Sequence, residues 1–188
     1  MSVQSNNNAA QSYKIIIAGP VGSGKTQATN VLSDKETVST EARTSRGVAG
    51  DKQTITVAMD YGITVLDSGE KVHIYGTPGH DRFDFMWEIL SENAAGLIVL
   101  VNAKDVDPVA DMQTYLDSFM PLVKDGALII GVTHAENIAS DLQQRLVEQL
   151  ITMNVAAEVV TVDARERVQT RQMVHTLIRK ISAQTQQV

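Results

Sequence analysis

The stretch "YKIIIAGPVGSGKT", Tyr13 to Thr26, runs from an apolar, β-branched segment into a glycine-rich turn. The apolar part predicts a buried strand over 13–19, and a helix is expected from about Lys25 to Leu32. The turn, Gly19 to Thr26, matches the phosphate-loop pattern G-x-x-x-x-G-K-[ST] in full. This motif requires a strand before it and a helix after it, and both are predicted here. The alternative is a glycine-rich turn that binds nothing, but the agreement of motif and context predicts nucleotide binding.

The chemistry of this loop assigns roles to its residues. Successive backbone N–H groups face the α- and β-phosphates, and the helix N-terminus adds partial positive charge. Lys25 reaches the β- and γ-phosphates, and the Thr26 hydroxyl is a ligand for Mg²⁺. The predicted phosphate-binding residues are Gly19, Pro20, Val21, Gly22, Ser23, Gly24, Lys25, Thr26 and Gln27.

The rest of the chain alternates short β-branched runs with helical segments. Further strands are expected at 54–66, 71–76, 96–102, 126–132 and 157–163, and helices at 80–93, 107–120, 137–154 and 167–182. Residues 33–53 are polar without a clear period and are predicted to form a long loop, a class that is often functional. The turn "DSGE" at 67–70 predicts a hairpin between the strands that flank it.

This alternation favours one α/β fold, a three-layer sandwich of the P-loop NTPase class. We predict a mostly parallel six-stranded sheet with one antiparallel edge hairpin. Residues 1–12 are rich in Ser, Asn and Gln and are predicted to be a disordered tail, followed by one domain over 13–184.

Composition excludes several classes of protein. The chain has 188 residues, a net charge of −6 and no cysteine, so disulfides are excluded and a cytoplasmic location is expected. It has no basic tract, which argues against a nucleic-acid partner. Its longest apolar run, Ala94 to Val101, is too short to span a bilayer, and neither end carries a lipidation signal. We therefore expect no direct membrane anchor.

The order of motifs along the chain resembles that of the Ras-like small GTPases. The likeness is closest to a bacterial branch of predicted small GTPases related to the MglA gliding-motility type. The stretches that carry it are "GPVGSGKT", "TVAMDYG", "YGTPGHDRFDFMWEIL", "GLIVLVNA" and "GVTHAE", and they span about Tyr13 to Arg165.

The resemblance implies a magnesium site and a catalytic site. Thr26 and Thr56 would be the magnesium ligands, with Thr54 the nearest rival to Thr56. Gly79 would offer its backbone N–H to the γ-phosphate, and His80 would orient the attacking water. The implied catalytic residues are His80, Lys25 and Gly79.

Other positions bear on the rate of hydrolysis. Val21 stands where Ras carries a glycine, and translational GTPases pair valine there with the histidine of "PGH". We therefore expect slow intrinsic hydrolysis and an activator that does not copy the Ras arginine geometry. Arg43 and Arg46 are candidates for an arginine finger supplied by the chain itself, although solvated loop arginines are the commoner explanation.

One position departs from the Ras-like pattern. Gly76 stands where D-x-x-G carries an aspartate that holds a magnesium-bound water. MglA-related proteins also lack this aspartate. Asp60, on the neighbouring strand of the hairpin, is the residue expected to compensate through solvent, and Asp67 lies farther along.

The base-reading motif is degenerate. The family pattern [NT]-K-x-D corresponds here to Thr133-His134-Ala135-Glu136. Glu136 would accept from the guanine N1 and N2 donors, and His134 would stack on the base. In "VDAR" at 162–165, the Ala164 N–H would meet guanine O6 and Arg165 would cover the ring. The alternative is a strand that ends in a polar turn.

Together these features predict a GTP/GDP molecular switch with slow, magnesium-dependent GTP hydrolysis. Its guanine nucleotide would order residues of about 33–58 and 76–92, through which protein effectors and regulators would bind. The alternative is a nucleotide-binding scaffold or regulatory protein with little turnover or relaxed base specificity. A small kinase is a weaker hypothesis, because no arginine-rich lid is evident.

Overall fold

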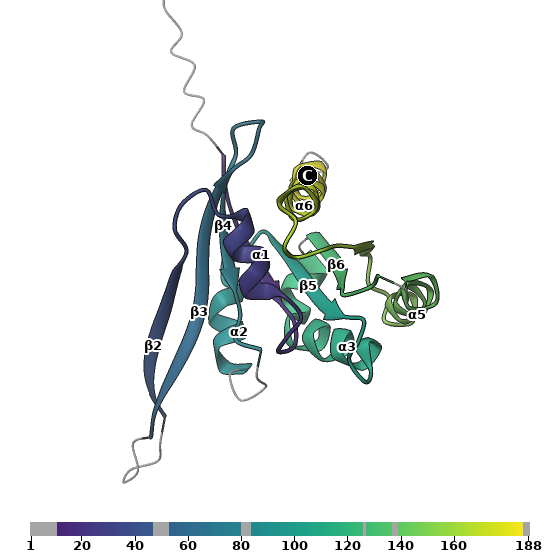
Figure 1. The fold of residues 1–188 in the computed structure, drawn as a ribbon, viewed down its shortest axis with the longest axis horizontal. Helices are drawn as coiled ribbons and strands as arrows, with labels where there is room; N and C mark the ends of the chain where they lie inside the picture. Colours follow the sequence, from purple (N-terminus) through teal and green to yellow (C-terminus); the bar gives the residue numbers. More distant parts are fainter. Residues whose placement is uncertain (1–10, 47–52, 80–83, 126, 137–138, 186–188) are drawn as a thin grey trace, which may run out of the picture.

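The phosphate-loop strand, β1 (Ser12–Ala18), lies inside a seven-stranded sheet of order β2-β3-β4-β1-β5-β6-β7 (Figure 1). The computed structural model describes residues 11–46, 53–79, 84–125, 127–136 and 139–185. The other strands are β2 (Val38–Arg46), β3 (Gln53–Val65), β4 (Lys71–Gly76), β5 (Gly96–Asn102), β6 (Ala127–Thr133) and β7 (Glu158–Thr161). β4, β1, β5, β6 and β7 pair in parallel, whereas β3 is antiparallel to both β2 and β4. The mostly parallel α/β fold predicted from the sequence is confirmed.

The strand count differs from the prediction of six. The additional strand is β2, which lies within the stretch predicted to be a loop and pairs with β3 from Val38↔Tyr61 to Arg46↔Gln53. Its sequence, "VSTEARTSR", has no run of alternating apolar residues, because an edge strand needs only backbone hydrogen bonds to one neighbour. The predicted hairpin, β3–β4, therefore forms the inner two strands of a three-stranded antiparallel edge.

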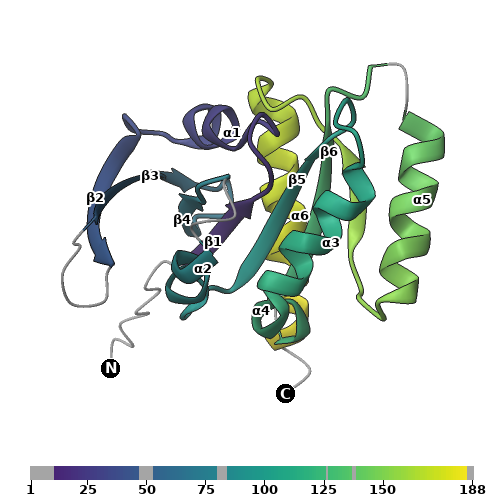
Figure 2. The same cartoon turned by 90° about the horizontal axis from the view of Figure 1, so that it is seen from below.

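Helices cover both faces of the sheet (Figure 2). They are α1 (Lys25–Leu32), α2 (Asp84–Ser91), α3 (Pro108–Ser118), α4 (Met120–Asp125), α5 (Ala139–Thr152) and α6 (Arg167–Thr185). α1 and α6 pack on one face, and α2 to α5 pack on the other. The short helix α4 was not predicted, because the expected helix that contains α3 ended at Met120. α3 begins as predicted, with the Asp107 side chain accepting from the Ala110 N–H at 3.1 Å.

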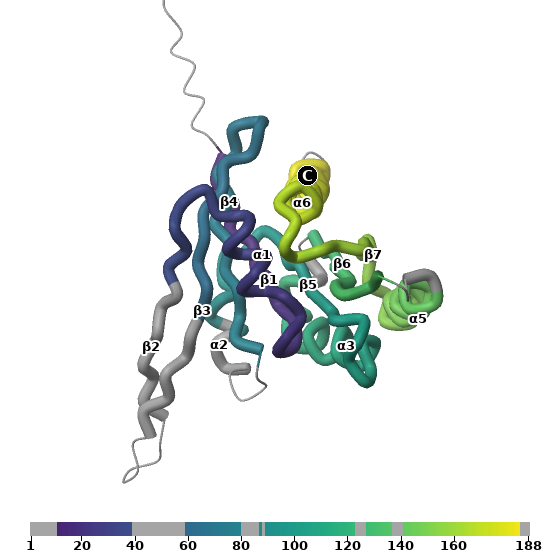
Figure 3. Tube along the Cα trace, viewed as in Figure 1, coloured from purple at the N-terminus to yellow at the C-terminus, as the bar shows by residue number. Residues whose placement is uncertain are grey.

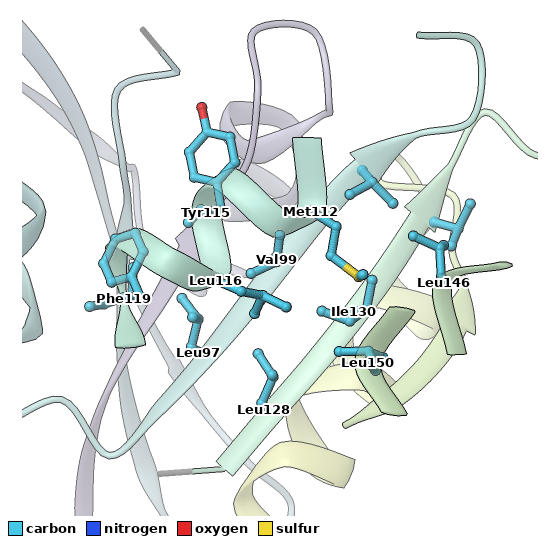
Figure 4. Close-up of a cluster of buried hydrophobic side chains, with 14 of the residues drawn as sticks. Leu97, Val99, Met112, Tyr115, Leu116, Phe119, Leu128, Ile130, Leu146 and Leu150 are labelled. Atoms are coloured by element: carbon cyan, nitrogen blue, oxygen red, sulfur yellow. The ribbon is translucent and has the colours of Figure 1, made fainter. Parts of the chain in front are cut away.

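Residues of the central strands alternate between the two hydrophobic layers. Leu97 and Val99 of β5 face the layer under α3 and α5, whereas Ile98 and Leu100 face the layer under α1 and α6. Figure 4 shows residues of the first layer, among them Leu116 and Phe119 on the helical side and Leu97, Leu128 and Ile130 on the strands. Because both faces are buried, the parallel strands are near-continuous apolar runs.

The carboxyl ends of the parallel strands lie at one edge of the sheet, where ligands bind in folds of this class. The phosphate loop follows β1, residues 77–79 follow β4, and residues 134–136 follow Thr133 at the end of β6. Figure 3 shows β7 beside β6 at the far side of the sheet, and residues 162–165 follow it. Within the described residues, no helix combines the length and apolar character needed to cross a membrane.

Candidate functional site

The phosphate loop leads from β1 into α1, and Lys25 is its most enclosed charged group. Lys25 is 8% exposed, and its Nζ donates to the Pro20 carbonyl at 2.7 Å. Burial lowers the pKa of Lys25 to about 8, while the nearby Asp60 carboxylate acts in the opposite direction. The Ser23 hydroxyl is fully buried and has no hydrogen-bond partner among the described residues. The loop therefore holds a buried cation and a buried hydroxyl that a phosphate would satisfy.

Gly79 packs directly against this loop. A Cβ placed on Gly79 would lie 2.8 Å from the Val21 backbone nitrogen and 2.9 Å from Lys25 Nζ. Any side chain at position 79 would therefore push the loop or its lysine aside. Val21 itself is 59% exposed. His80 falls outside the described residues, as do Asp81 to Phe83.

Tyr115 of α3 holds Gly79 from the other side. Its Oη donates to the Gly79 carbonyl at 3.2 Å, and its ring is almost fully buried. The ring packs on Trp87 of α2 with centroids 5.0 Å apart, and Trp87 stacks on Phe119 at 5.6 Å. No pattern in the sequence points to Tyr115, because it is far from Gly79 along the chain.

Asp60 meets the phosphate loop from the antiparallel part of the sheet. It is the partner of Gly76 across the β3–β4 pair, and its Oδ2 accepts from the Thr26 hydroxyl at 2.5 Å. The link between Asp60 and Thr26 is thus direct, whereas the expected compensation was through solvent. Asp67 lies at the β3–β4 turn, where it pairs with Arg171 at 2.8 Å, and so it is not part of this group.

The register of the β2–β3 pair places Thr56 away from Asp60 along β3, and its role as a magnesium ligand stays a prediction. Thr56 stands opposite Arg43 in the β2–β3 pair, four residues along β3 from Asp60. At about 3.3 Å per residue, this separation amounts to roughly 13 Å along the strand. Thr54 lies still farther from Asp60, opposite Ser45. Side-chain positions at 39–58, which include Arg43 and Arg46, are not described.

The predicted base-reading residues line one pocket with the phosphate loop. The pocket has a volume of about 540 Å³. It is lined by Gly22, Gly24, Lys25, Thr26 and Gln27 of the loop, by Thr133, His134, Ala135 and Glu136 after β6, and by Thr161, Val162, Asp163, Ala164, Arg165 and Gln169. Three segments far apart in the sequence therefore enclose one space large enough for a nucleotide.

Direct contacts hold these segments together. The buried Thr133 hydroxyl is within hydrogen-bond distance of the Ser23 carbonyl, at 3.1 Å, and of the Val101 carbonyl, at 3.2 Å. A Cβ on Gly24 would lie 2.8 Å from the Ala164 methyl group, so Ala164 packs against the loop. His134 adopts a φ of 56°, in the left-handed region, and its side chain is exposed. Thr133 and Ala164 therefore both contact the phosphate loop directly.

Ion pairs lie along the pocket rim. Glu136 Oε2 is 3.3 Å from Lys104 Nζ, and Arg165 pairs with Asp163 at 2.7 Å. Hydrogen bonds from the Arg165 side chain and backbone lower the pKa of Asp163 to about 2. Gln169 Oε1 accepts from the Asp163 N–H at 2.9 Å, which fixes the loop that precedes α6. Neither Lys104 nor Gln169 belongs to a recognisable motif, and the sequence prediction missed both.

The oxygen atoms of Thr26 and Asp60 suit a magnesium ion whose remaining ligands are water and phosphate oxygens. The Thr26 hydroxyl and the Asp60 carboxylate supply hard oxygen ligands of the kind that Mg²⁺ prefers, together with water and substrate phosphates. In the part of the chain that the structure describes, no cluster of three or more His, Asp or Glu side chains forms a protein-only metal site. The residues present therefore fit an ion that arrives with a nucleotide.

Residues 32–186 match the family described as "conserved hypothetical ATP binding protein". The chain belongs to this family. The match begins after the phosphate loop, so motif and family are separate indications that the protein binds a nucleotide. An uncharacterized protein of Methanocaldococcus jannaschii is 42% identical over 50 residues, which are 26% of this chain and 31% of that protein. The matched stretch thus spans about a third of the length of this curated relative.

Proposed function

We propose that the protein is a Ras-like GTP/GDP switch, related to the bacterial MglA type, that hydrolyses GTP slowly with Mg²⁺. The observation that carries the proposal is the shared pocket. It places the phosphate loop, the threonine and glutamate of the base-reading motif and the Ala164–Arg165 loop around one space. The residues assigned to the phosphates and those assigned to the base therefore line the same pocket, which supports a single nucleotide as the ligand.

At the phosphate end, Lys25 and the loop backbone bind the β- and γ-phosphates. Lys25 is held by the Pro20 carbonyl at 2.7 Å, so its ammonium is oriented before the substrate arrives. Thr26 and Asp60 would hold Mg²⁺, which neutralises charge on the phosphate oxygens when it is bound. The Asp60 carboxylate supplies the negative charge that position 76 lacks.

Hydrolysis requires a water molecule in line with the γ-phosphoryl group. The water oxygen forms a bond to phosphorus while the bond to the β–γ bridging oxygen breaks, which yields GDP and phosphate. The packing of Gly79 on Val21 and Lys25 supports its assignment as a backbone donor to the γ-phosphate. His80 follows Gly79 in the sequence and is assigned to orient the water. Slow turnover is expected, because Val21 stands at the loop position where a larger side chain obstructs an incoming arginine finger.

At the base end, Glu136 is assigned to the guanine N1 and N2 donors and the Ala164 N–H to O6. His134 and Arg165 flank the ring on the exposed side of the pocket. A carboxylate accepts hydrogen bonds and does not donate, so it favours guanine over adenine. The family description names ATP, and base choice is therefore the part of the proposal that most needs measurement.

The functional result of GTP binding and hydrolysis would be a change in the protein surface that partners recognise. GTP would order residues of about 33–58 and 76–92, and effectors and regulators in the cytoplasm would bind there. A nucleotide-binding scaffold would bind the same ligand and show no turnover.

Two measurements test this proposal: the affinities for four nucleotides and the rate of GTP hydrolysis. Equilibrium binding of GDP, GTP, ADP and ATP, with Mg²⁺ and with EDTA, should show the tightest binding for GTP with Mg²⁺. Single-turnover assays with GTP should then release phosphate slowly. Tight binding without any phosphate release, even with cell extract, would favour the scaffold. Equal affinity for guanine and adenine nucleotides would contradict the role of Glu136.

A further inference from the structure

Lys104 stands beside the carboxylate assigned to base recognition. Its ammonium Nζ is 3.3 Å from Glu136 Oε2, and the two side chains are 57% and 62% exposed. Glu136 is among the residues that line the pocket and Lys104 is not, so the ammonium lies next to the carboxylate that is assigned to base recognition. A surface ion pair of this kind contributes little to stability, which leaves it available for another role.

The backbone around Lys104 is tied to the strand that carries the base-reading motif. The Ala103 N–H donates to the Thr133 carbonyl at 2.9 Å, and Asn102 and Thr133 are register partners of β5 and β6. The Lys104 N–H donates to Asn102 Oδ1 at 3.0 Å. Lys104 and Glu136 thus follow the ends of two strands that are hydrogen-bonded to each other, and this pairing keeps the two residues close.

The chemistry of the pair differs from that of a carboxylate alone. A carboxylate only accepts hydrogen bonds, and an ammonium only donates them. Guanine carries an N–H donor at N1, whereas adenine carries a lone pair there, which a bare carboxylate repels. An ammonium bonded to the same carboxylate presents a donor to that lone pair. The pair can therefore bind either purine: the carboxylate accepts from guanine N1, or the ammonium donates to adenine N1.

We propose that Lys104 is a specificity-determining residue that allows the pocket to accept adenine as well as guanine nucleotides. This inference rests on the proposed function, because it requires the base to lie at Glu136. The substrate class is then a purine nucleoside triphosphate, bound with a guanine preference that Lys104 reduces. Arg165 does not take this role, because its guanidinium Nε and Nη2 already donate to the Asp163 carboxylate.

The test is the ratio of GTP to ATP affinity in the full chain. Lys104→Met removes the ammonium and keeps most of the side-chain length. Lys180→Met is the control, because Lys180 forms a partly exposed ion pair with Glu158 at 3.5 Å, and neither residue lines the nucleotide pocket. Taking the ratio within each variant cancels the general effect of a lost positive charge on triphosphate binding.

The expected result is a GTP to ATP affinity ratio about tenfold higher in Lys104→Met, through weaker ATP binding, as for loss of one charge-assisted hydrogen bond. Lys104→Arg, which keeps a cationic donor, should stay within about twofold of the wild type. Lys180→Met should do the same.

Two outcomes would overturn the inference alone. One is an unchanged ratio in Lys104→Met, and the other is an equal rise in Lys180→Met, while the wild-type chain still binds and hydrolyses GTP. The proposed function fails differently. In that case the wild type binds neither nucleotide, or Glu136→Ala leaves the ratio unchanged, and the role of Lys104 is overturned with it.

Discussion

The carboxylate of Asp60 lies beside Gly76, in the space that a side chain at position 76 would take. A Cβ on Gly76 would be 3.2 Å from Asp60 Cβ and 3.6 Å from Asp60 Oδ2. The two residues are partners across the β3–β4 pair, and Asp60 also accepts from the Thr26 hydroxyl. In the proposed switch, the acidic group that Ras-like proteins carry at the end of one strand would be supplied by the adjacent strand.

Asp60→Asn should weaken the dependence of nucleotide binding on magnesium. The amide keeps the shape and loses the negative charge, so GTP affinity with Mg²⁺ should fall by about tenfold, as for loss of one charged contact. GTP affinity in EDTA should change much less. Asp67→Asn is the control, since Asp67 lies at the distant β3–β4 turn. Identical magnesium dependence in wild type and Asp60→Asn would contradict the assignment of Asp60.

Gly76→Asp should impair the protein even though it restores the Ras-like sequence. The new carboxylate would be crowded against Asp60 and against Thr29 Oγ1, which a Cβ at 76 would approach to 3.2 Å. We expect a loss of about 1–3 kcal/mol in the free energy of unfolding, measured by urea denaturation. Combining it with Asp60→Gly removes the crowding and should recover most of the loss. A double variant no more stable than Gly76→Asp would refute the exchange of the two positions.

Tyr115→Phe should slow GTP hydrolysis while leaving nucleotide affinity within about twofold of the wild type. The hydroxyl holds the Gly79 carbonyl, and so fixes the peptide that leads to His80. The phenyl ring keeps its packing on Trp87. Loss of one positioning hydrogen bond is expected to reduce the single-turnover rate by about tenfold. Tyr13→Phe, which removes a hydroxyl bonded to Ser182 away from the pocket, is the control. An unchanged rate in Tyr115→Phe would show that this bond does not support hydrolysis.

Lys25 should make nucleotide binding sensitive to alkaline pH. Its pKa of about 8 in the free protein, against 10.5 ordinarily, means that the ammonium is partly lost above pH 8, and phosphate binding restores it. Affinity should therefore fall by up to tenfold per pH unit above about pH 8, with uptake of about one proton per nucleotide at pH 9. The lowered pKa also means that Lys25 costs folding stability at neutral pH, and that stability should rise between about pH 8 and 10.5.

Calorimetry in two buffers of different ionisation enthalpy measures the proton uptake. Lys25→Met at pH 9 supplies the baseline, since it retains every other titrating group of protein and nucleotide. Equal proton uptake in the two proteins would contradict the assignment to Lys25.

The sequence predicted those parts of the fold and site that local pattern determines. The strand, glycine loop and helix around Lys25 are fixed by neighbouring residues, and buried strands such as β5 are near-continuous apolar runs. The polar edge strand β2 was missed because its pairing, rather than its hydrophobicity, defines it. Tyr115 and Lys104 were missed for a similar reason, since their partners are brought close only by the folded sheet.

The site prediction was strongest where a motif and a strand end coincide. Thr133, Glu136 and Ala164 were all assigned from sequence and all line the pocket with the phosphate loop. The place of Asp60 was anticipated only as a solvent-mediated contact, because the β3–β4 register cannot be read to the residue from sequence. Thr56 and His80 remain predictions, since their side chains are not described.

The proposed switch must bind GTP in this pocket and hydrolyse it. This requirement is tested most directly by a single-turnover experiment with the full chain in excess over GTP labelled at the γ-phosphate. With Mg²⁺, the proposed switch should convert the bound GTP slowly but completely to GDP and free phosphate, and with EDTA it should not. GTP that stays bound and intact in the presence of Mg²⁺, or that does not bind, would contradict the proposal.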